Sequence, residues 1–295
     1  MRPISRERQA WLLLLPMLAI MVAVTGFPLL NTLRLSFTDA LLTGRRTEPH
    51  WVGWQNFAYV LSDPYFGQAF VRTLYFTFVS VGIEILLGVL VALLLDREFV
   101  GRGIVRALIV LPWALPTIVN AMLWRLIYAP EFGSLNALLT QFGLIDSYRS
   151  WLGDPDLTMD MVIIADVWKN YSLVALIVLA ALQTIPRELY QAAAIDGAGP
   201  WVRFWKITFP HILGPLTVAL ILRMIEAFKV FDIIYVMTRG GPADVTKTVS
   251  FWVYQESFSY LRAGSGAAYA VTVALTSAVM ITCYIILLRR QGRIG

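Results

Sequence analysis

Four charged side chains interrupt an otherwise apolar stretch and recur every three residues: Arg223, Glu226, Lys229 and Asp232. Ionisable groups in a membrane-spanning segment are costly, so they mark a function or a charge pair. On one continuous helix the alternating signs would form a self-neutralising ladder, with further salt bridges to a partner chain. The same groups could instead line a wet cavity near the middle of the membrane that binds a polyol. Lys229 and Asp232 are the best ligand candidates by depth, since a rise of 1.5 Å per residue places Asp232 about 29 Å from the start of the span.

Two other segments combine aromatic rings with amide and charged groups, a mixture that suits sugar binding. Their candidate ligands are Asn120, Trp124, Asn170 and Tyr171. Packing or an interfacial aromatic belt would explain the tryptophans as well. Pro112 and Pro116 predict a break or kink just before the first segment. Asp166 and Lys169 have the spacing to neutralise each other, and Glu84 is expected to pair with a charge on another helix.

The sequence offers little for catalysis or metal binding. A single cysteine, Cys283, excludes an internal disulfide and a cysteine-based zinc site, and two histidines, His50 and His211, exclude a histidine-rich metal site. No stretch matches the phosphate-binding pattern Gly-x4-Gly-Lys-Ser/Thr. We therefore expect no catalytic residue, no bound metal and no ATP hydrolysis on this chain, which makes an intramembrane enzyme the least favoured class.

Residues 184–212 are expected to form two short helices that meet at a sharp corner. Thr184 is a possible N-cap of the first helix. Gly197 suits the left-handed position after its end, and Pro200 and Pro210 open and close the second helix.

Three consecutive alanines, Ala192–Ala194, make the first of these helices slim. The backbone of another protein could therefore approach it closely. The alternative is an amphipathic connector that lies on lipid headgroups, but such a helix would carry bulky apolar residues and lysine at these positions. Docking to a partner protein is favoured.

These groups are set in a strongly apolar chain. Of 295 residues, 58% are hydrophobic and 15% are charged, and the mean hydropathy is +0.67. This composition argues against a water-soluble enzyme, a disordered chain and a coiled coil. A membrane helix needs about 20 apolar residues. Stretches that meet this need lie at about 10–33, 69–95, 104–128, 161–182, 213–237 and 263–288. We therefore predict an all-α polytopic membrane protein with six transmembrane helices, the first a retained anchor rather than a cleaved signal peptide.

Basic residues predict the orientation of the chain. One set of loops carries Arg2, Arg6, Arg8, Arg97, Arg102, Arg106, Arg187, Arg203, Lys206, Arg289, Arg290 and Arg293. The opposite set carries Arg45, Arg46, Arg149, Arg239, Lys247 and Arg262. The richer side is expected to face the cytoplasm, and it includes both termini.

The corner in the fourth connecting loop resembles a known motif. The sequence from Gln191 to Ala198, Gln-Ala-Ala-Ala-Ile-Asp-Gly-Ala, is similar to the EAA loop of ABC-importer permeases, whose pattern is Glu-Ala-Ala-x-x-x-Gly with a proline further on. Three other segments resemble the carbohydrate branch of this family, in particular its MalF-type permeases: Phe27-Pro28-Leu29, Trp54-Gln55-Asn56-Phe57 and Gly240-Gly241-Pro242. The resemblance covers nearly the whole chain.

This resemblance implies a type I ABC-importer transmembrane fold and a permease subunit for a sugar or sugar-like solute, such as an oligosaccharide, glycoside or polyol derivative. The first short helix would be a coupling helix that docks on an ATPase subunit. Its implied contact residues are Glu188, Gln191, Ala192, Ala193, Asp196, Gly197 and Ala198. Gln191 stands where the family has Glu, so this part of the contact is expected to be neutral.

The resemblance also implies partners and a location. The partners would be a homologous second permease, two ATP-binding subunits that hold ATP and magnesium, an extracytoplasmic solute-binding protein and membrane lipid, without nucleic acid. The location would be the bacterial inner membrane. The expected divisions are an anchor helix with the first outer loop at 1–68, a transmembrane domain at 69–288 with its coupling loop at 184–212, and a cytoplasmic tail at 289–295.

An ion- or proton-coupled secondary transporter is the alternative function. It predicts inverted internal repeats with broken helices in both halves. The sequence contains no convincing repeat of this kind.

Overall fold

The computed structural model describes residues 6–43 and 48–290. Throughout these ranges the regular structure is helical, and an isolated β-bridge joins Thr38 to Trp51. The chain divides into a smaller unit, residues 1–64 and 252–276, and a larger unit, residues 65–251 and 277–295. Some residues used to predict orientation, and most of the expected tail at 289–295, lie outside the described residues: Arg2, Arg45, Arg46 and Arg293.

The smaller unit contains the first span. A single apolar helix is formed by α1 (Arg6–Met21), a π-helical turn (Val22–Gly26) and α2 (Phe27–Leu35). Its most apolar stretch is 0% buried within the chain, so its side chains are left to face lipid or another subunit. The rest of this unit includes α3 (Gln55–Ser62), the end of α13 (Val249–Tyr254), a π-helical turn (Gln255–Ser259) and the beginning of α14 (Ala263–Arg290).

The larger unit is a helical bundle built around one buried helix. Its helices are α4 (Pro64–Asp96), α5 (Arg102–Ala114), α6 (Thr117–Ile127), α7 (Ser134–Gln141), α8 (Thr158–Leu182), α9 (Arg187–Ile195), α10 (Pro200–Arg203), α11 (Phe209–Phe228), α12 (Asp232–Met237), the start of α13 and the end of α14.

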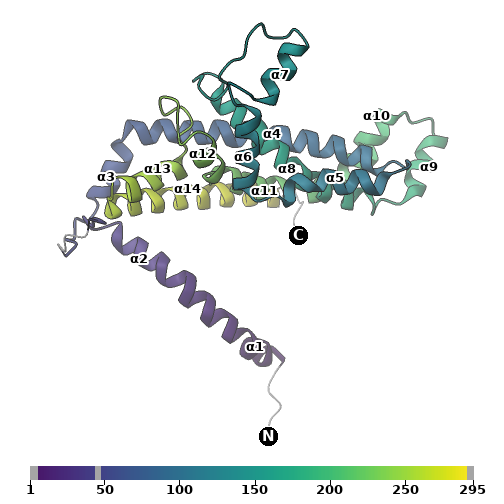
Figure 1. Ribbon diagram of the computed structural model, residues 1–295. Helices are drawn as coiled ribbons and strands as arrows, with labels where there is room; N and C mark the ends of the chain where they lie inside the picture. The colour runs from purple at the N-terminus through teal and green to yellow at the C-terminus, as the bar shows by residue number, and fades with distance from the viewer. Residues whose placement is uncertain (1–5, 44–47, 291–295) are drawn as a thin grey trace. The chain divides into compact units, whose positions relative to one another are not determined.

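The buried helix at the centre of this unit is α8. Its most apolar stretch is 61% buried, and α5 and α11 pack directly on it. The contact with α4 is close because a Cβ at Gly88 would lie only 2.5 Å from Cγ1 of Val174. Within this unit, α9 and α10 lie at one end of the bundle and α7 stands off from its side (Figure 1).

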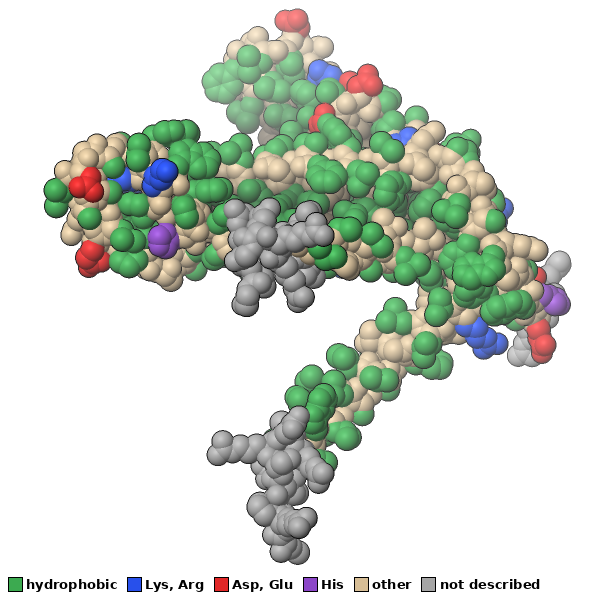
Figure 2. Space-filling model, turned by 180° about the vertical axis from the view of Figure 1, so that it is seen from behind, with side chains coloured by type: hydrophobic (Ala, Val, Ile, Leu, Met, Phe, Trp, Pro, Cys, Tyr) green, Lys and Arg blue, Asp and Glu red, His purple; other side chains and the backbone are tan. Residues whose placement is uncertain are grey.

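The prediction of six spans is confirmed. Five continuous helices are long and apolar enough to cross a membrane, and α5 with α6 makes a sixth candidate span that is bent by 98°. The predicted break at the two prolines is also confirmed, since α5 ends two residues after Pro112 and Pro116 is the N-cap of α6. On the face of the larger unit seen in Figure 2, hydrophobic side chains cover the length of the bundle, and charged ones gather at the α9–α10 end and on the α7 projection.

The predicted span at 213–237 is wrong at both ends. The helix begins at Pro200 and continues through a π-helical turn (Phe204–Thr208) to Phe228. Pro210 does not close a separate helix, because it lies directly after the π-helical turn, in the first turn of α11, and the helix continues through it. The helix ends at Phe228, with Lys229 as its C-cap, so Asp232 begins α12 rather than extending α11.

The corner before α10 forms largely as predicted. Gly197 has a φ of +75°, the left-handed conformation expected after α9. The N–H groups of Gly197 and Ala198 donate to the carbonyls of Ala194 and Ala193, the paired pattern that ends helices at a glycine. Thr184 is not the N-cap: its hydroxyl donates to the Ala181 carbonyl at the end of α8, and Pro186 holds the N-cap position.

Candidate functional site

A polar cleft opens in the larger unit where the two helix breaks meet. Its empty space is about 690 Å³, counted with the open solvent at its mouth. The residues that line it come from the end of α5, the start of α6, α8, the end of α11 and the start of α12: Trp113, Thr117, Asp166, Lys169, Asn170, Arg223, Glu226, Ala227, Lys229, Val230, Phe231, Asp232 and Ile233. Because both breaks supply lining residues, the cleft owes its shape to Pro116 and to the end of α11 at Phe228.

A buried ion-pair network forms one wall of the cleft. Arg223 on α11 is 3% exposed and Glu84 on α4 is 0% exposed. The Arg223 Nε and Nη2 atoms donate to the two Glu84 carboxylate oxygens over 2.7 and 3.0 Å. Nη2 also donates to Asp166 on α8 over 3.3 Å, and Nη1 donates to Glu226. One guanidinium thus joins α4, α8 and α11, and the prediction that Glu84 pairs with another helix is confirmed.

Asp166 and Lys169 do not form the direct ion pair that their spacing suggested, although the charge of each acts on the other. Asp166 is ion-paired with Arg223 and accepts a hydrogen bond from Asn170 over 2.9 Å. The Lys169 amine donates instead to the Thr117 hydroxyl over 2.7 Å, which connects α8 to the first residue of α6. The self-neutralising ladder forms only in part. Arg223 pairs with Glu226 along the helix, but the end of α11 at Phe228 separates Glu226 from the two outer charges, and Arg223 also pairs with carboxylates on other helices.

The structure brings three of the predicted ligand residues to the cleft. Asn170 lines it from α8, and Lys229 and Asp232 line it from the two sides of the break after α11. Lys229 and Asp232 are exposed, so both charges face open space.

The other three predicted ligand residues lie elsewhere. Asn120 is 0% exposed, and its amide donates to the Ala165 carbonyl of α8, so it joins helices. Trp124 packs edge-on against Trp168 at 5.9 Å, as the packing alternative predicted. Tyr171 is half-buried and does not line the cleft.

Sequence reasoning missed Trp113, Thr117 and Phe231 as lining residues. Trp113 and Thr117 flank the predicted proline break, and that break was the available signal. Phe231 lies at the end of the break between α11 and α12, which no proline or glycine marks.

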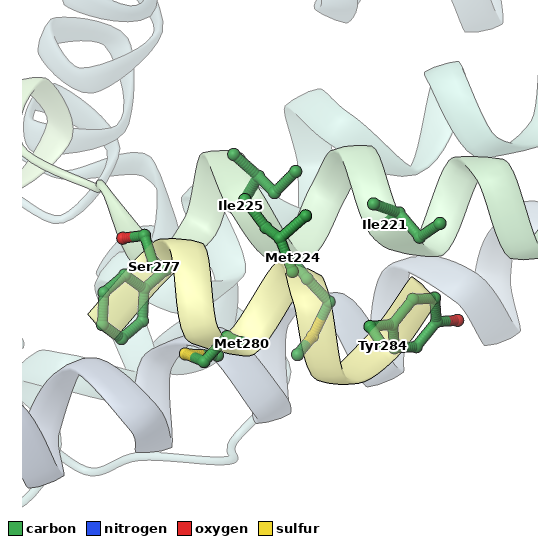
Figure 3. Close-up of a pocket in the computed structure, with 8 residues that line it drawn as sticks. Ile221, Met224, Ile225, Ser277, Met280 and Tyr284 are labelled. Atoms are coloured by element: carbon green, nitrogen blue, oxygen red, sulfur yellow. The ribbon is translucent and has the colours of Figure 1, made fainter. Parts of the chain in front are cut away.

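A second hollow, between α11 and α14, is apolar. Ile221, Met224 and Ile225 of α11 and Ser277, Met280 and Tyr284 of α14 are among the residues that line it (Figure 3). Its empty space is about 400 Å³. It lacks the convergent amide and charged groups that fix a polar ligand. It is therefore a poorer candidate for a sugar than the cleft.

The predicted coupling residues gather at the α9 end of the larger unit. No residue of α9 is buried, and Ile195 is 88% exposed. Glu188, Gln191, Ala192, Asp196 and Gly197 are exposed, and Ala193 and Ala198 are half-buried. The chain therefore leaves the predicted contact face uncovered.

Two polar contacts hold α9 in place. The Tyr190 and Thr208 hydroxyls are hydrogen-bonded over 2.9 Å, which ties α9 to the long helix that continues as α11. Arg187 forms an ion pair with Glu98 over 2.7 Å, and this hydrogen bond holds the pKa of the Glu98 carboxyl below its usual range. The α9 corner is thus attached to its own long helix and to the loop after α4.

Known proteins with similar sequences cover almost the full chain. A family model for the binding-protein-dependent transport system inner membrane component matches residues 84–293. The trehalose/maltose transport system permease protein MalF of Thermococcus litoralis is 39% identical, over 96% of this chain and 93% of the relative. The trehalose transport system permease protein SugA of Mycobacterium tuberculosis is 36% identical, over 91% of this chain and 85% of the relative.

A solved structure supports the fold independently. A chain in the crystal structure of a bacterial alginate ABC transporter, in complex with an alginate pentasaccharide-bound periplasmic protein, superposes with a TM-score of 0.85. The alignment covers 99% of this chain and 98% of that one at 22% sequence identity. At that identity the likeness establishes the ABC-importer transmembrane fold.

The family match, the close relatives and the six candidate spans agree with one another. The predicted family, its membrane location and its permease role are confirmed, and the subunit is not itself an enzyme. The chain belongs to the family of inner membrane components of binding-protein-dependent transport systems, and it is a multi-pass permease subunit of an ATP-driven importer.

Proposed function

We propose that this permease imports a sugar or sugar-like solute and forms half of the translocation path with a homologous second permease. Relatives named for trehalose and maltose, for trehalose, and for sulfoquinovosyl glycerol support the carbohydrate class. The cleft supports it as well, because it combines an amide, charged groups and the aromatic rings of Trp113 and Phe231. Within the cleft, Asn170, Lys229 and Asp232 are the proposed ligand contacts.

The remaining partners in this proposal are two ATP-binding subunits and an extracytoplasmic solute-binding protein. ATP and magnesium would bind to the ATPase subunits, since this sequence has no phosphate-binding loop. The family description names dependence on a binding protein, and the structural neighbour was solved with a periplasmic protein. Both descriptions support this composition.

One observation carries the proposed mechanism: a single helix runs from the α9 corner to the cleft. The continuous helix Pro200–Phe228 has 29 residues, which is about 43 Å at 1.5 Å per residue. Near its start, the Thr208 hydroxyl is hydrogen-bonded to Tyr190 of α9, and its last residue, Phe228, is followed by Lys229 in the cleft. In the proposal, ATPase subunits closing around ATP displace α9, and this helix carries the displacement to the ligand cleft.

Reconstitution tests the proposal. The chain should co-purify with a second permease and an ATPase, and proteoliposomes that hold the complete set should take up the solute only with ATP and with inhibition by vanadate. Uptake by this chain alone, without ATP, would favour a secondary transporter instead and would refute the proposal.

A further inference from the structure

We infer that the cleft selects uncharged solutes, such as neutral disaccharides and polyols, against anionic ones, such as sugar phosphates and sugar sulfonates. This inference rests on the proposed function, because it assigns a substrate class to the same cleft. It is carried by the number and the pairing of the charges in the cleft wall.

The cleft wall has no excess of positive charge. Its basic groups are Lys169, Arg223 and Lys229, and its acidic groups are Asp166, Glu226 and Asp232. Glu84 lies directly behind them, bonded to Arg223 over 2.7 Å. With all groups ionised the set carries a formal charge of −1, and protonation of one carboxyl would only bring it to neutrality.

The cation best suited to an anionic ligand is already engaged. Arg groups bind phosphate and carboxylate through paired hydrogen bonds, but the donors of Arg223 go to Glu84, Asp166 and Glu226. An incoming phosphate would have to displace a buried carboxylate from its partner. Leaving such a carboxylate unpaired is strongly unfavourable, so Arg223 is not free to bind the ligand.

The two lysines do not supply a phosphate site either. Lys169 donates to Thr117 and lies beside the Asp166 carboxylate. Lys229 is exposed, but Asp232 of opposite charge lines the same cleft three residues later. A neutral, hydroxyl-rich ligand can donate a hydrogen bond to Asp232 and accept one from Lys229 without adding charge. An anionic ligand would be repelled by the Asp232 carboxylate.

The partial charges at the helix ends do not change the charge balance of the cleft wall. Thr117 begins α6, whose N-terminus carries partial positive charge, and Lys229 follows the last residue of α11, whose C-terminus carries partial negative charge. Both residues line the cleft, so the two contributions oppose each other. A unit charge about 6–8 Å from the ligand changes affinity by roughly 30- to 100-fold at the effective permittivity of protein sites.

The test compares two ligands that share one disaccharide and differ by a single phosphate group. Trehalose and trehalose 6-phosphate are titrated into the complete permease–ATPase complex in nanodiscs without the solute-binding protein, which would impose its own selectivity. Wild-type complex should bind trehalose at least tenfold more tightly than trehalose 6-phosphate. Asp232→Lys should shift the affinity ratio toward the phosphate by at least tenfold. Asp146→Lys makes the same charge change at an exposed residue outside the cleft and should leave the ratio unchanged.

Three results would overturn the inference. These are equal or tighter binding of trehalose 6-phosphate by the wild type, no change of the ratio in Asp232→Lys, and no binding of either compound. None of them affects the proposed function, which stands or falls on co-purification and ATP-dependent uptake. A complex that requires ATP for uptake but prefers the phosphate would refute the charge argument alone.

Discussion

Replacing Arg223 with methionine tests the buried network most directly. The substitution removes a guanidinium that is 3% exposed and keeps most of the apolar stem. It leaves Glu84, at 0% exposure, and Asp166, at 7%, without their shared cation. Removal of one partner from a buried ion pair costs about 3–5 kcal/mol, because the remaining charge is left uncompensated.

The cost should appear as a lower unfolding temperature of the purified permease. For a unit of roughly 200 residues, each kcal/mol lowers Tm by about 2–4 °C, so Arg223→Met should lose about 6–20 °C in detergent. Glu226→Gln is the matched control, since the side chain of that Arg223 partner is 60% exposed and exposed ion pairs contribute about 0–1 kcal/mol. Its Tm should fall by only a few degrees.

A double variant separates lost charge pairing from lost packing. Arg223→Met combined with Glu84→Gln removes one of the two uncompensated buried charges, so it should recover part of the Tm lost by Arg223→Met alone. The reasoning is refuted when Arg223→Met unfolds no earlier than Glu226→Gln. It is also refuted when the double variant is no more stable than the single one.

Three further outcomes are expected. Gly197→Val should leave the permease folded but uncouple ATP hydrolysis from uptake in proteoliposomes, because a φ of +75° is strained for a branched residue, even though its Cβ would meet nothing within 4 Å. Gly199→Ala is the control: its φ is −68°, so this variant should stay coupled. Gly88→Ala should lower Tm because its Cβ would lie 2.5 Å from a valine of α8, whereas Gly82→Ala on the same helix has open space and should not, so equal Tm values would contradict the close contact. Arg187 lowers the pKa of Glu98, so the ion pair that holds α9 should be complete above the usual pKa range of glutamate and should be lost as the pH falls through the lowered pKa. The loss should appear as a broader distribution of spin-label distances between α9 and the loop after α4. A distance distribution that does not change with pH would contradict this.

The sequence predicted the features that depend on local chemistry. Proline spacing predicted the break between α5 and α6, and Gly197 predicted the left-handed corner, because these residues restrict or permit particular backbone angles by themselves. The length of each apolar stretch predicted the spans, because about 20 consecutive apolar residues suffice to cross a membrane whatever the rest of the chain does. The EAA-like loop predicted the family, and its residues do lie uncovered at one end of the bundle.

Contacts between distant helices could not be predicted in the same way. The break after Phe228 carries no proline or glycine, and it occurs where Lys229 and Asp232 open toward the cleft. Spacing predicted the pair of Arg223 with Glu226 along its own helix, but not its two hydrogen bonds to Glu84, 139 residues earlier in the chain. Tertiary packing decided the pairing of Arg223, because Glu84 and Asp166 lie on other helices that only the folded chain brings to it.

The α9 corner and the Arg223 network act on opposite ends of the same helix, so damage to them should have different consequences. Arg223 lies 23 residues after Pro200 and six before Lys229, or about 35 Å and 9 Å along the helix. Bonded to α4 and α8, Arg223 holds the cleft end against the rest of the bundle, while the α9 end is held by exposed or half-buried contacts that cost little to rearrange. In the proposed mechanism, a displacement at α9 would reach the cleft as a rotation of the helix about Arg223, reduced to roughly a quarter by the ratio of the two lengths. A bend at the π-helical turn or at Pro215 would reduce it further. Corner variants should accordingly keep the stability of the bundle and lose coupling, whereas network variants should lose stability, because they remove the point about which the helix turns.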